Sequence, residues 1–161
     1  MKTETKLRVF KDGHNFASAH ILPGMGKCER LHGHNYYVTA ELCGETDEKG
    51  AIIDFNAINP IIAGICNALD HKTLLAEKND GMTINRKGDS IKISLNDKKY
   101  QFPAGDCVLL PVTTTTVEKL SAYILGELLK ELTGKLDAID WIEVGVREGA
   151  GQMALARKNI G

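Results

Sequence analysis

The stretch CERLHGHNY at residues 28–36 places a thiol, a carboxylate and two imidazoles within seven consecutive positions. His32 and His34 flank a glycine, and the aromatic and β-branched residues that follow are typical of a strand. Because side chains two positions apart on a strand project to the same face, both imidazoles are expected on one side of a sheet. The pattern indicates a metal site, although a pair of surface histidines in a turn would have the same spacing.

A third histidine, His20, ends an earlier segment of alternating apolar residues. If the two segments pair as antiparallel strands, His20 lies beside His32 and His34. Three neutral imidazoles on one face form an open site of the kind that catalytic zinc occupies, with a fourth position left for water or substrate. A metal with a purely structural role is the alternative.

Four other side chains could take part in proton transfer or ligand binding. Cys28 lies among basic residues, which favour the reactive thiolate. Asp70 precedes His71 at the expected end of a helix, where an acid can orient the imidazole ring. A histidine at that place also interacts favourably with the helix dipole and needs no catalytic role. Glu148 ends a late strand just before a glycine-rich turn, where a carboxylate either binds a ligand or is simply solvated.

The hydrophobic periodicity predicts the elements that position these residues. Helices are expected over residues 58–69 and 113–134, the first capped by Asp54 or Asn56, and strands over residues 7–22, 34–44, 140–149 and 152–158. The first of these is expected to be either a continuous strand or a strand with a bulge at Gly13. Residues 77–106, rich in Lys, Asp, Asn and Gly, are expected to form an inserted surface hairpin. The order β-β-α-α-β-β predicts an α+β fold in one domain over residues 1–161.

The composition excludes several classes of protein. A net charge of −1 at pH 7 leaves no basic footprint, so a nucleic-acid partner is not expected. No apolar run reaches the roughly 20 residues that a membrane span requires. Four scattered cysteines and a first segment, MKTETK, without a signal-peptide core predict a cytoplasmic protein without a disulfide framework.

Six motifs in order resemble the 6-pyruvoyl-tetrahydropterin synthase family, which includes the bacterial 6-carboxy-tetrahydropterin synthases of queuosine synthesis. They are FASAHIL (16–22), CERLHGHNY (28–36), GAIIDF (50–55), LDHKTLL (69–75), TVEKLSAYI (116–124) and VGVREG (144–149). The resemblance implies the tunnelling (T-) fold, a four-stranded antiparallel sheet with two helices on one face. It also implies homohexamers of two stacked trimers with active sites at subunit interfaces.

The resemblance assigns roles to the candidate residues. It implies a Zn²⁺ ion on His20, His32 and His34 that holds the side-chain hydroxyls of 7,8-dihydroneopterin triphosphate. The other matching residues are Cys28 as general base, Asp70 and His71 as a relay pair, Glu148 as the pterin anchor and Thr116 in the pterin pocket. The implied products are 6-pyruvoyl- or 6-carboxy-tetrahydropterin.

Glu29 leaves the product open. In a side branch of the resembled family, a glutamate at this place replaces the cysteine as base and cleavage of the substrate side chain gives 6-hydroxymethyl-dihydropterin. Both Cys28 and Glu29 are present in this sequence. Glu29 either provides a second base or pairs on the surface with Lys27 or Arg30. A zinc-stabilised pterin-binding protein without turnover is a further alternative, which an intact set of Cys28, Asp70 and His71 disfavours.

Overall fold

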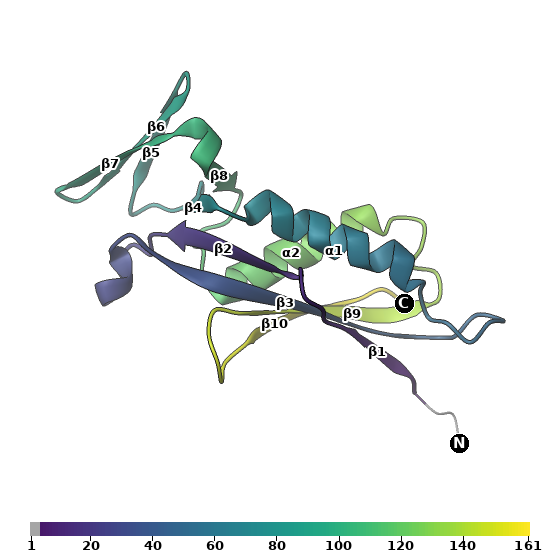
Figure 1. The fold of residues 1–161 in the computed structure, drawn as a ribbon. Helices are drawn as coiled ribbons and strands as arrows, with labels where there is room; N and C mark the ends of the chain where they lie inside the picture. The colour runs from purple at the N-terminus through teal and green to yellow at the C-terminus, as the bar shows by residue number, and fades with distance from the viewer. Residues whose placement is uncertain (1–3) are drawn as a thin grey trace.

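The computed structural model describes residues 4–161, which form a seven-stranded sheet with two helices on one face and a separate three-stranded sheet (Figure 1). The helices are α1 (Phe55–Leu69) and α2 (Val117–Glu131). The large sheet contains β1 (Lys6–Val9), β2 (Asn15–His20), β3 (His32–Gly44), β4 (Lys72–Ala76), β8 (Cys107–Leu110), β9 (Ile139–Arg147) and β10 (Ala154–Asn159). The small sheet contains β5 (Thr83–Lys87), β6 (Ser90–Leu95) and β7 (Lys98–Pro103), and two 3-10 turns are η1 (Gly26–Glu29) and η2 (Ala104–Asp106).

The α+β class and the order of the main elements are as expected, but the four-stranded sheet is wrong in its number of strands. The order across the large sheet is β10-β9-β3-β2-β4-β8, with β1 also paired to β3. Two of the additional strands, β4 and β8, are short apolar runs that pair in parallel. A run of four or five apolar residues has too little periodicity to distinguish a strand from a buried loop.

The first expected strand is in fact two strands. Gly13 has a φ of +95°, a left-handed conformation that interrupts the strand rather than bulging it. On either side of this break, β1 pairs with the far end of β3 and β2 pairs with its beginning. Both β1 and β2 therefore take their register from the long strand β3.

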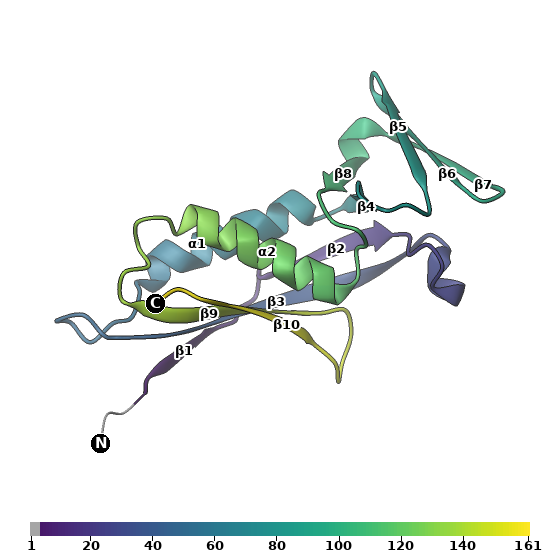
Figure 2. The ribbon, with the colours of Figure 1, turned by 180° about the vertical axis from the view of Figure 1, so that it is seen from behind.

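Both helices lie on the same face of the large sheet, as Figures 1 and 2 show from opposite directions, and their buried apolar side chains belong to the core cluster. The Asp54 side chain accepts a hydrogen bond from the Asn56 amide at 2.8 Å, which confirms the expected N-cap of α1. Ile58, Ile62 and Leu69 from α1 are buried in the core between the helices and the sheet. In the part of the protein that the structure describes, no helix is long and apolar enough to cross a membrane.

The expected hairpin has a third strand, because β5 pairs with β6 as well as β6 with β7. We call this three-stranded unit the accessory sheet; it stands at one end of the molecule beyond β4 and β8 (Figure 2). Ile91 and Ile93 of β6 are buried against Ile21 and Leu75 of the main fold. The accessory sheet is thus fixed to the large sheet by an apolar cluster of its own.

The register between β2 and β3 places the histidines. His20 lies opposite His32 and Ser18 lies opposite His34, so the two strands present these side chains on the helix-covered face. Gly33 lies opposite Ala19, and a Cβ atom at this glycine would be 2.9 Å from the Ser18 carbonyl oxygen. The glycine between the histidines therefore permits the close approach of the two strands.

We expect Gly33→Ala to destabilise the protein by about 1–3 kcal/mol, because the added methyl group forces β2 and β3 apart. Urea unfolding monitored by circular dichroism measures this loss. The matched control is Gly64→Ala in α1, where a Cβ atom meets nothing within 4 Å. In that helix alanine should leave stability unchanged or raise it by up to about 1 kcal/mol. Equal stabilities of the Gly33→Ala protein and the unsubstituted protein would contradict the steric explanation.

Candidate active site

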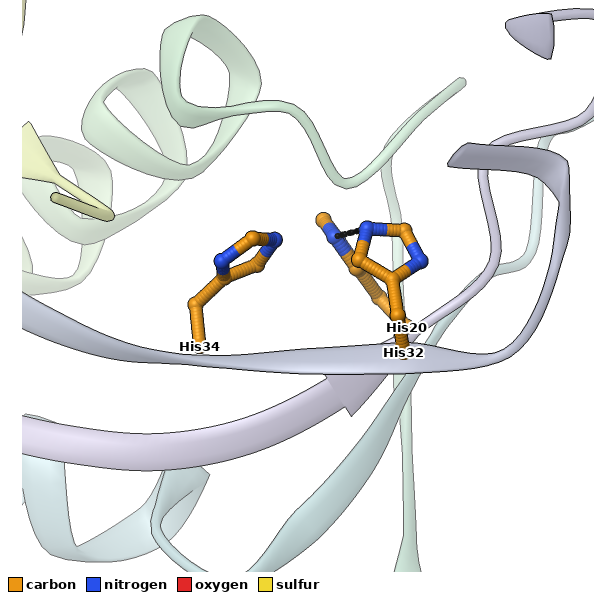
Figure 3. A group of neighbouring side chains, drawn as sticks. All are labelled: His20, His32 and His34. Atoms are coloured by element: carbon orange, nitrogen blue, oxygen red, sulfur yellow. Dashed lines mark hydrogen bonds between the residues drawn. The ribbon is translucent and has the colours of Figure 1, made fainter. Parts of the chain in front are cut away.

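Three imidazole rings converge on the helix-covered face of the sheet, where β2 ends and β3 begins (Figure 3). The ligand atoms of His20, His32 and His34 all lie within 4.8 Å of one another. The Nε2 atoms of His20 and His32 are 3.0 Å apart. Among residues 4–161, no other group of three or more His, Cys, Asp or Glu side chains converges in this way.

Hydrogen bonds determine which ring nitrogens can bind a cation. His20 Nδ1 lies 3.1 Å from the Thr115 carbonyl oxygen, and His32 Nδ1 lies 2.6 Å from the Arg30 carbonyl oxygen. A carbonyl oxygen only accepts, so each Nδ1 must carry the proton and each Nε2 must present a lone pair. Two lone pairs that face each other at 3.0 Å repel unless a cation lies between or beside them. The donor set therefore fits a metal ion bound through imidazole nitrogens.

Burial keeps His20 in the neutral form that a metal requires. His20 is fully buried, and burial together with the neighbouring His32 and His34 lowers its pKa to about 4. Near pH 7 the ring is therefore uncharged, which is the form that ligates metals. Burial, together with Glu148, raises the pKa of Tyr36, whose neutral hydroxyl lies 3.2 Å from His20 Nδ1.

Sequence analysis missed the residue that orients His20. Thr115 is fully buried, and its carbonyl and hydroxyl oxygens lie 3.1 and 3.2 Å from His20 Nδ1. The available signal is the run of four threonines before α2, in which the resemblance assigns a role to Thr116 but none to Thr115. Thr116 is the N-cap residue of α2, although its side chain makes no capping hydrogen bond.

A carboxylate lies next to the histidine cluster. Glu148 Oε2 is 3.7 Å from His34 Nε2, and both side chains are only about one quarter exposed. Glu148 follows directly after β9, and β9 pairs with β3 so that Arg147 lies opposite Tyr37. The Arg147 guanidinium lies over the Tyr37 ring at 4.0 Å, which fixes the strand end that carries Glu148.

The loop between β2 and β3 carries Cys28 and Glu29 on the short turn η1. The Cys28 carbonyl accepts a hydrogen bond from the Leu22 amide at 3.0 Å, which closes the loop. Glu29 does not pair with Lys27 or Arg30. Its salt-bridge partner is Lys98 of the accessory sheet, with Nζ 3.0 Å from Oε1. The prediction that Glu29 pairs with a neighbour in the sequence is therefore wrong.

Asp70 and His71 lie outside the histidine cluster. Asp70 accepts hydrogen bonds from the Ala17 amide and from His71 Nδ1, each at 2.7 Å. These two bonds, the first more than the second, lower the pKa of Asp70. The His71 side chain is 85% exposed and borders an open depression of about 580 Å³, whose lining includes Ala17, Ala19 and also His34 of the cluster. Within one copy of the protein, His71 is therefore not among the side chains that converge on the candidate metal site.

The fifth histidine, His14, lies outside the cluster and is buried rather than solvent-facing. Neither of its ring nitrogens has a hydrogen-bond partner in the structure. Burial lowers its pKa, so the ring is neutral near pH 7. These observations assign His14 to the packing of β2 against α1.

Comparison with known proteins places the protein among pterin enzymes. Residues 8–159 match the family model for 6-pyruvoyl tetrahydropterin synthase. A Methanocaldococcus jannaschii protein provisionally named 6-carboxy-5,6,7,8-tetrahydropterin synthase is 36% identical over 150 residues, with 92% of each sequence covered. The Bacillus subtilis 6-carboxy-5,6,7,8-tetrahydropterin synthase is 36% identical over 117 residues, which span 71% of this sequence and 65% of that protein.

Solved structures agree with these sequence matches. A Plasmodium vivax 6-pyruvoyltetrahydropterin synthase is 32% identical and superposes with a TM-score of 0.92 over 99% of this protein and 100% of that one. That structure is of a variant in which a catalytic glutamate is replaced by alanine. Since the superposition spans nearly the whole protein, the accessory sheet has a counterpart there.

We expect His32→Ala to abolish stoichiometric binding of Zn²⁺, used as the probe metal. The variant would keep only two of the three imidazole ligands that an open zinc site uses. The loss of affinity should exceed the roughly 10–100-fold that removal of an outer hydrogen-bond partner costs. Zinc content after dialysis, measured by mass spectrometry, provides the test. His71→Ala is the control and should retain the metal, since His71 lies outside the cluster. Full zinc content after both His32→Ala and His34→Ala would refute the site.

Proposed function

Since the chain belongs to the 6-pyruvoyl tetrahydropterin synthase family, we propose that it is a zinc-dependent enzyme acting on 7,8-dihydroneopterin triphosphate. Its relatives are named as tetrahydropterin synthases, which are lyases. The observation that carries the proposal is the convergence of three imidazole nitrogens beside the Glu148 carboxylate. This arrangement combines a metal site with a group suited to holding the pterin ring.

The proposed binding roles follow from the chemistry of the side chains. Glu148 accepts two parallel hydrogen bonds from the pterin 2-amino group and N3–H, a pairing that suits a carboxylate. His20, His32 and His34 would hold Zn²⁺, which supplies a Lewis acid that makes the C–H bonds beside the substrate hydroxyls more acidic. Thr116 is proposed to line the pterin pocket, since the residue before it bonds to His20.

Cys28 is the proposed general base. It lies in the loop that joins the two strands bearing the histidines, and its thiolate would remove a proton from the substrate side chain. His71, oriented by Asp70, would relay protons to and from that thiolate. Triphosphate leaves with an internal redox transfer, which gives 6-pyruvoyl-tetrahydropterin. The 6-carboxy product forms instead when water adds and the two terminal carbons of the side chain leave as acetaldehyde.

Cleavage of the substrate side chain is a second candidate reaction. A catalytic glutamate in the Plasmodium vivax relative supports it, since this protein has Glu29 directly after Cys28. With Glu29 as base, a carbon–carbon bond within the substrate side chain breaks, 6-hydroxymethyl-dihydropterin forms and the remaining carbons leave as a phosphorylated aldehyde. The same metal and pterin sites would serve both reactions.

The proposed proton transfer predicts that Cys28→Ala lowers turnover of 7,8-dihydroneopterin triphosphate by about 100-fold or more, the range of a general base. Chromatography of the products from zinc-loaded protein measures both the rate and the product. Cys107→Ala is the matched control, because this cysteine is also half-buried but lies in β8, away from the proposed base. If Cys28→Ala retained full turnover while Glu29→Gln abolished it, Cys28 would not be the base.

We further propose that the active site is shared between copies of the protein in a homohexamer of two stacked trimers. The Asp70–His71 pair lies outside the metal cluster and the His71 side chain is 85% exposed, so we expect a second copy to complete the relay. In the described part of one copy, the outer edges of β8 and β10 have no neighbouring strand, and Leu155 on β10 is 60% exposed. Assembly through such edges satisfies their free backbone groups.

A shared site predicts complementation between two inactive variants. Cys28→Ala and His71→Ala, unfolded together and reassembled, should regain roughly one quarter of the normal activity, because random pairing joins an intact Cys28 to an intact His71 at that frequency. Light scattering on the same sample measures the assembly. Each variant reassembled alone is the control and should stay inactive. A mixture without recovered activity, despite hexamers of normal mass, would place both groups in one copy.

Two further predictions concern partners and location. The net charge predicts that no nucleic acid binds, and the scattered cysteines and the first segment predict a cytoplasmic location. We also propose that residues 77–106 are an insertion within a single domain, since the accessory sheet packs on the main fold through a shared apolar cluster.

A further inference from the structure

One ion pair joins the accessory sheet to the loop that carries the proposed base. Lys98 Nζ on β7 lies 3.0 Å from Glu29 Oε1 on η1. The other carboxylate oxygen of Glu29 accepts a hydrogen bond from the Gly24 amide at 2.9 Å. Glu29 directly follows Cys28 and precedes His32 by three residues, so Lys98 acts on the centre of the proposed catalytic segment.

The two bonds restrain Glu29 in a particular way. Both oxygens are occupied, and the Gly24 amide together with Lys98 lowers the pKa of the Glu29 carboxyl. A carboxylate stabilised as the anion is a weaker proton acceptor, and one held by two partners must break both bonds to reach a substrate. Glu29 as it stands is therefore poorly placed to compete with Cys28 for the substrate proton.

The contact is built into the accessory sheet. On β7, Lys98 lies opposite the buried Leu95 and is 37% exposed at its side chain, whereas the adjacent Lys99 is on the exposed face. Asn96, in the turn between β6 and β7, borders the same cavity as Glu29. This end of the accessory sheet therefore lies beside the η1 loop, and Lys98 is the charged group that it presents to the Glu29 carboxylate.

The surroundings contain few other charges that could replace Lys98. Glu29 and Asn96 border a cavity of about 480 Å³, where the other charged residues that line it are Lys78 and Asp80. No ion pair joins either of them to Glu29 in the described part of the protein, where its one salt-bridge partner is Lys98. We therefore expect that removal of Lys98 leaves the Glu29 carboxylate without a salt-bridge partner, since no neighbouring cation already pairs with it.

We propose that Lys98 is a positioning residue that holds Glu29 away from proton transfer, so that the accessory sheet directs the enzyme to the Cys28 reaction. The inference rests on the proposed function, in which Cys28 and Glu29 are alternative bases at one site. In this view the product is decided by a contact that lies outside the metal and pterin sites.

The test compares the products that zinc-loaded, full-length variants form from 7,8-dihydroneopterin triphosphate. Lys98→Met should raise the ratio of 6-hydroxymethyl-dihydropterin to elimination product by about twofold to fivefold, the range that a partly exposed ion pair supports. Lys98→Arg, which keeps the positive charge, should show the same product ratio as the unsubstituted protein. The matched control Lys99→Met, on the other side of the same strand, should leave the ratio unchanged.

A second readout does not depend on turnover. Carbon-13 NMR titration of the glutamate carboxyls, with the Glu29 signal assigned by its absence in Glu29→Gln, should show a higher pKa for Glu29 in Lys98→Met than in Lys99→Met. A merely structural role of Lys98 would lower both products together without changing their ratio.

Three outcomes would overturn the inference: an unchanged ratio in Lys98→Met, an equal change in Lys99→Met, or a normal enzyme that forms only the 6-hydroxymethyl product. The last would mean that Glu29 already acts as the base with Lys98 in place. Failure of the proposed function is distinct, because the unsubstituted, zinc-loaded protein would then form neither pterin product.

Discussion

The antiparallel register of β2 on β3 is the constraint on which the rest of the site depends. It places His20 opposite His32 and leaves their two Nε2 lone pairs 3.0 Å apart. A slip by one residue would turn every side group of one strand to the other face. The glycine between His32 and His34 maintains this register, because any larger residue there would meet the Ser18 carbonyl. Packing thus supports the pairing of strands that brings the two imidazole nitrogens together, and a cation bound beside them would relieve their repulsion.

The fold separates two groups that the proposed chemistry uses together. At one end of the helix-covered face, Thr115 and Tyr36 surround the buried His20. Burial there keeps the imidazole neutral, the form that binds a metal. The Asp70–His71 pair lies outside this cluster, and His71 is 85% exposed at its side chain. In the proposed function, the association of copies brings these groups together.

The accessory sheet links an outlying part of the fold to the chemistry. Its apolar side packs on Ile21 and Leu75, and the turn between β6 and β7 then projects toward the loop before β3. Since Cys28 and Glu29 occupy adjacent positions on that loop, a single lysine can change the balance between two bases without touching the metal site. Such a contact separates the control of the product from the binding of the substrate.

The sequence alone predicted the histidine cluster, the helices and the main strands. The reason is local: the period of a strand places both histidines of HGH on one face, and amphipathic runs identify α1, α2 and the long strands. The sheet's extra strands, β4 and β8, and the partner of Glu29 were decided only by tertiary structure. Short apolar runs carry no distinctive period, and Lys98 is 69 residues from Glu29 along the sequence. Likewise, spacing could not reveal that Asp70 bonds to the Ala17 amide of β2 while His71 stays outside the cluster, because that placement depends on the long-range pairing of β4 with β2.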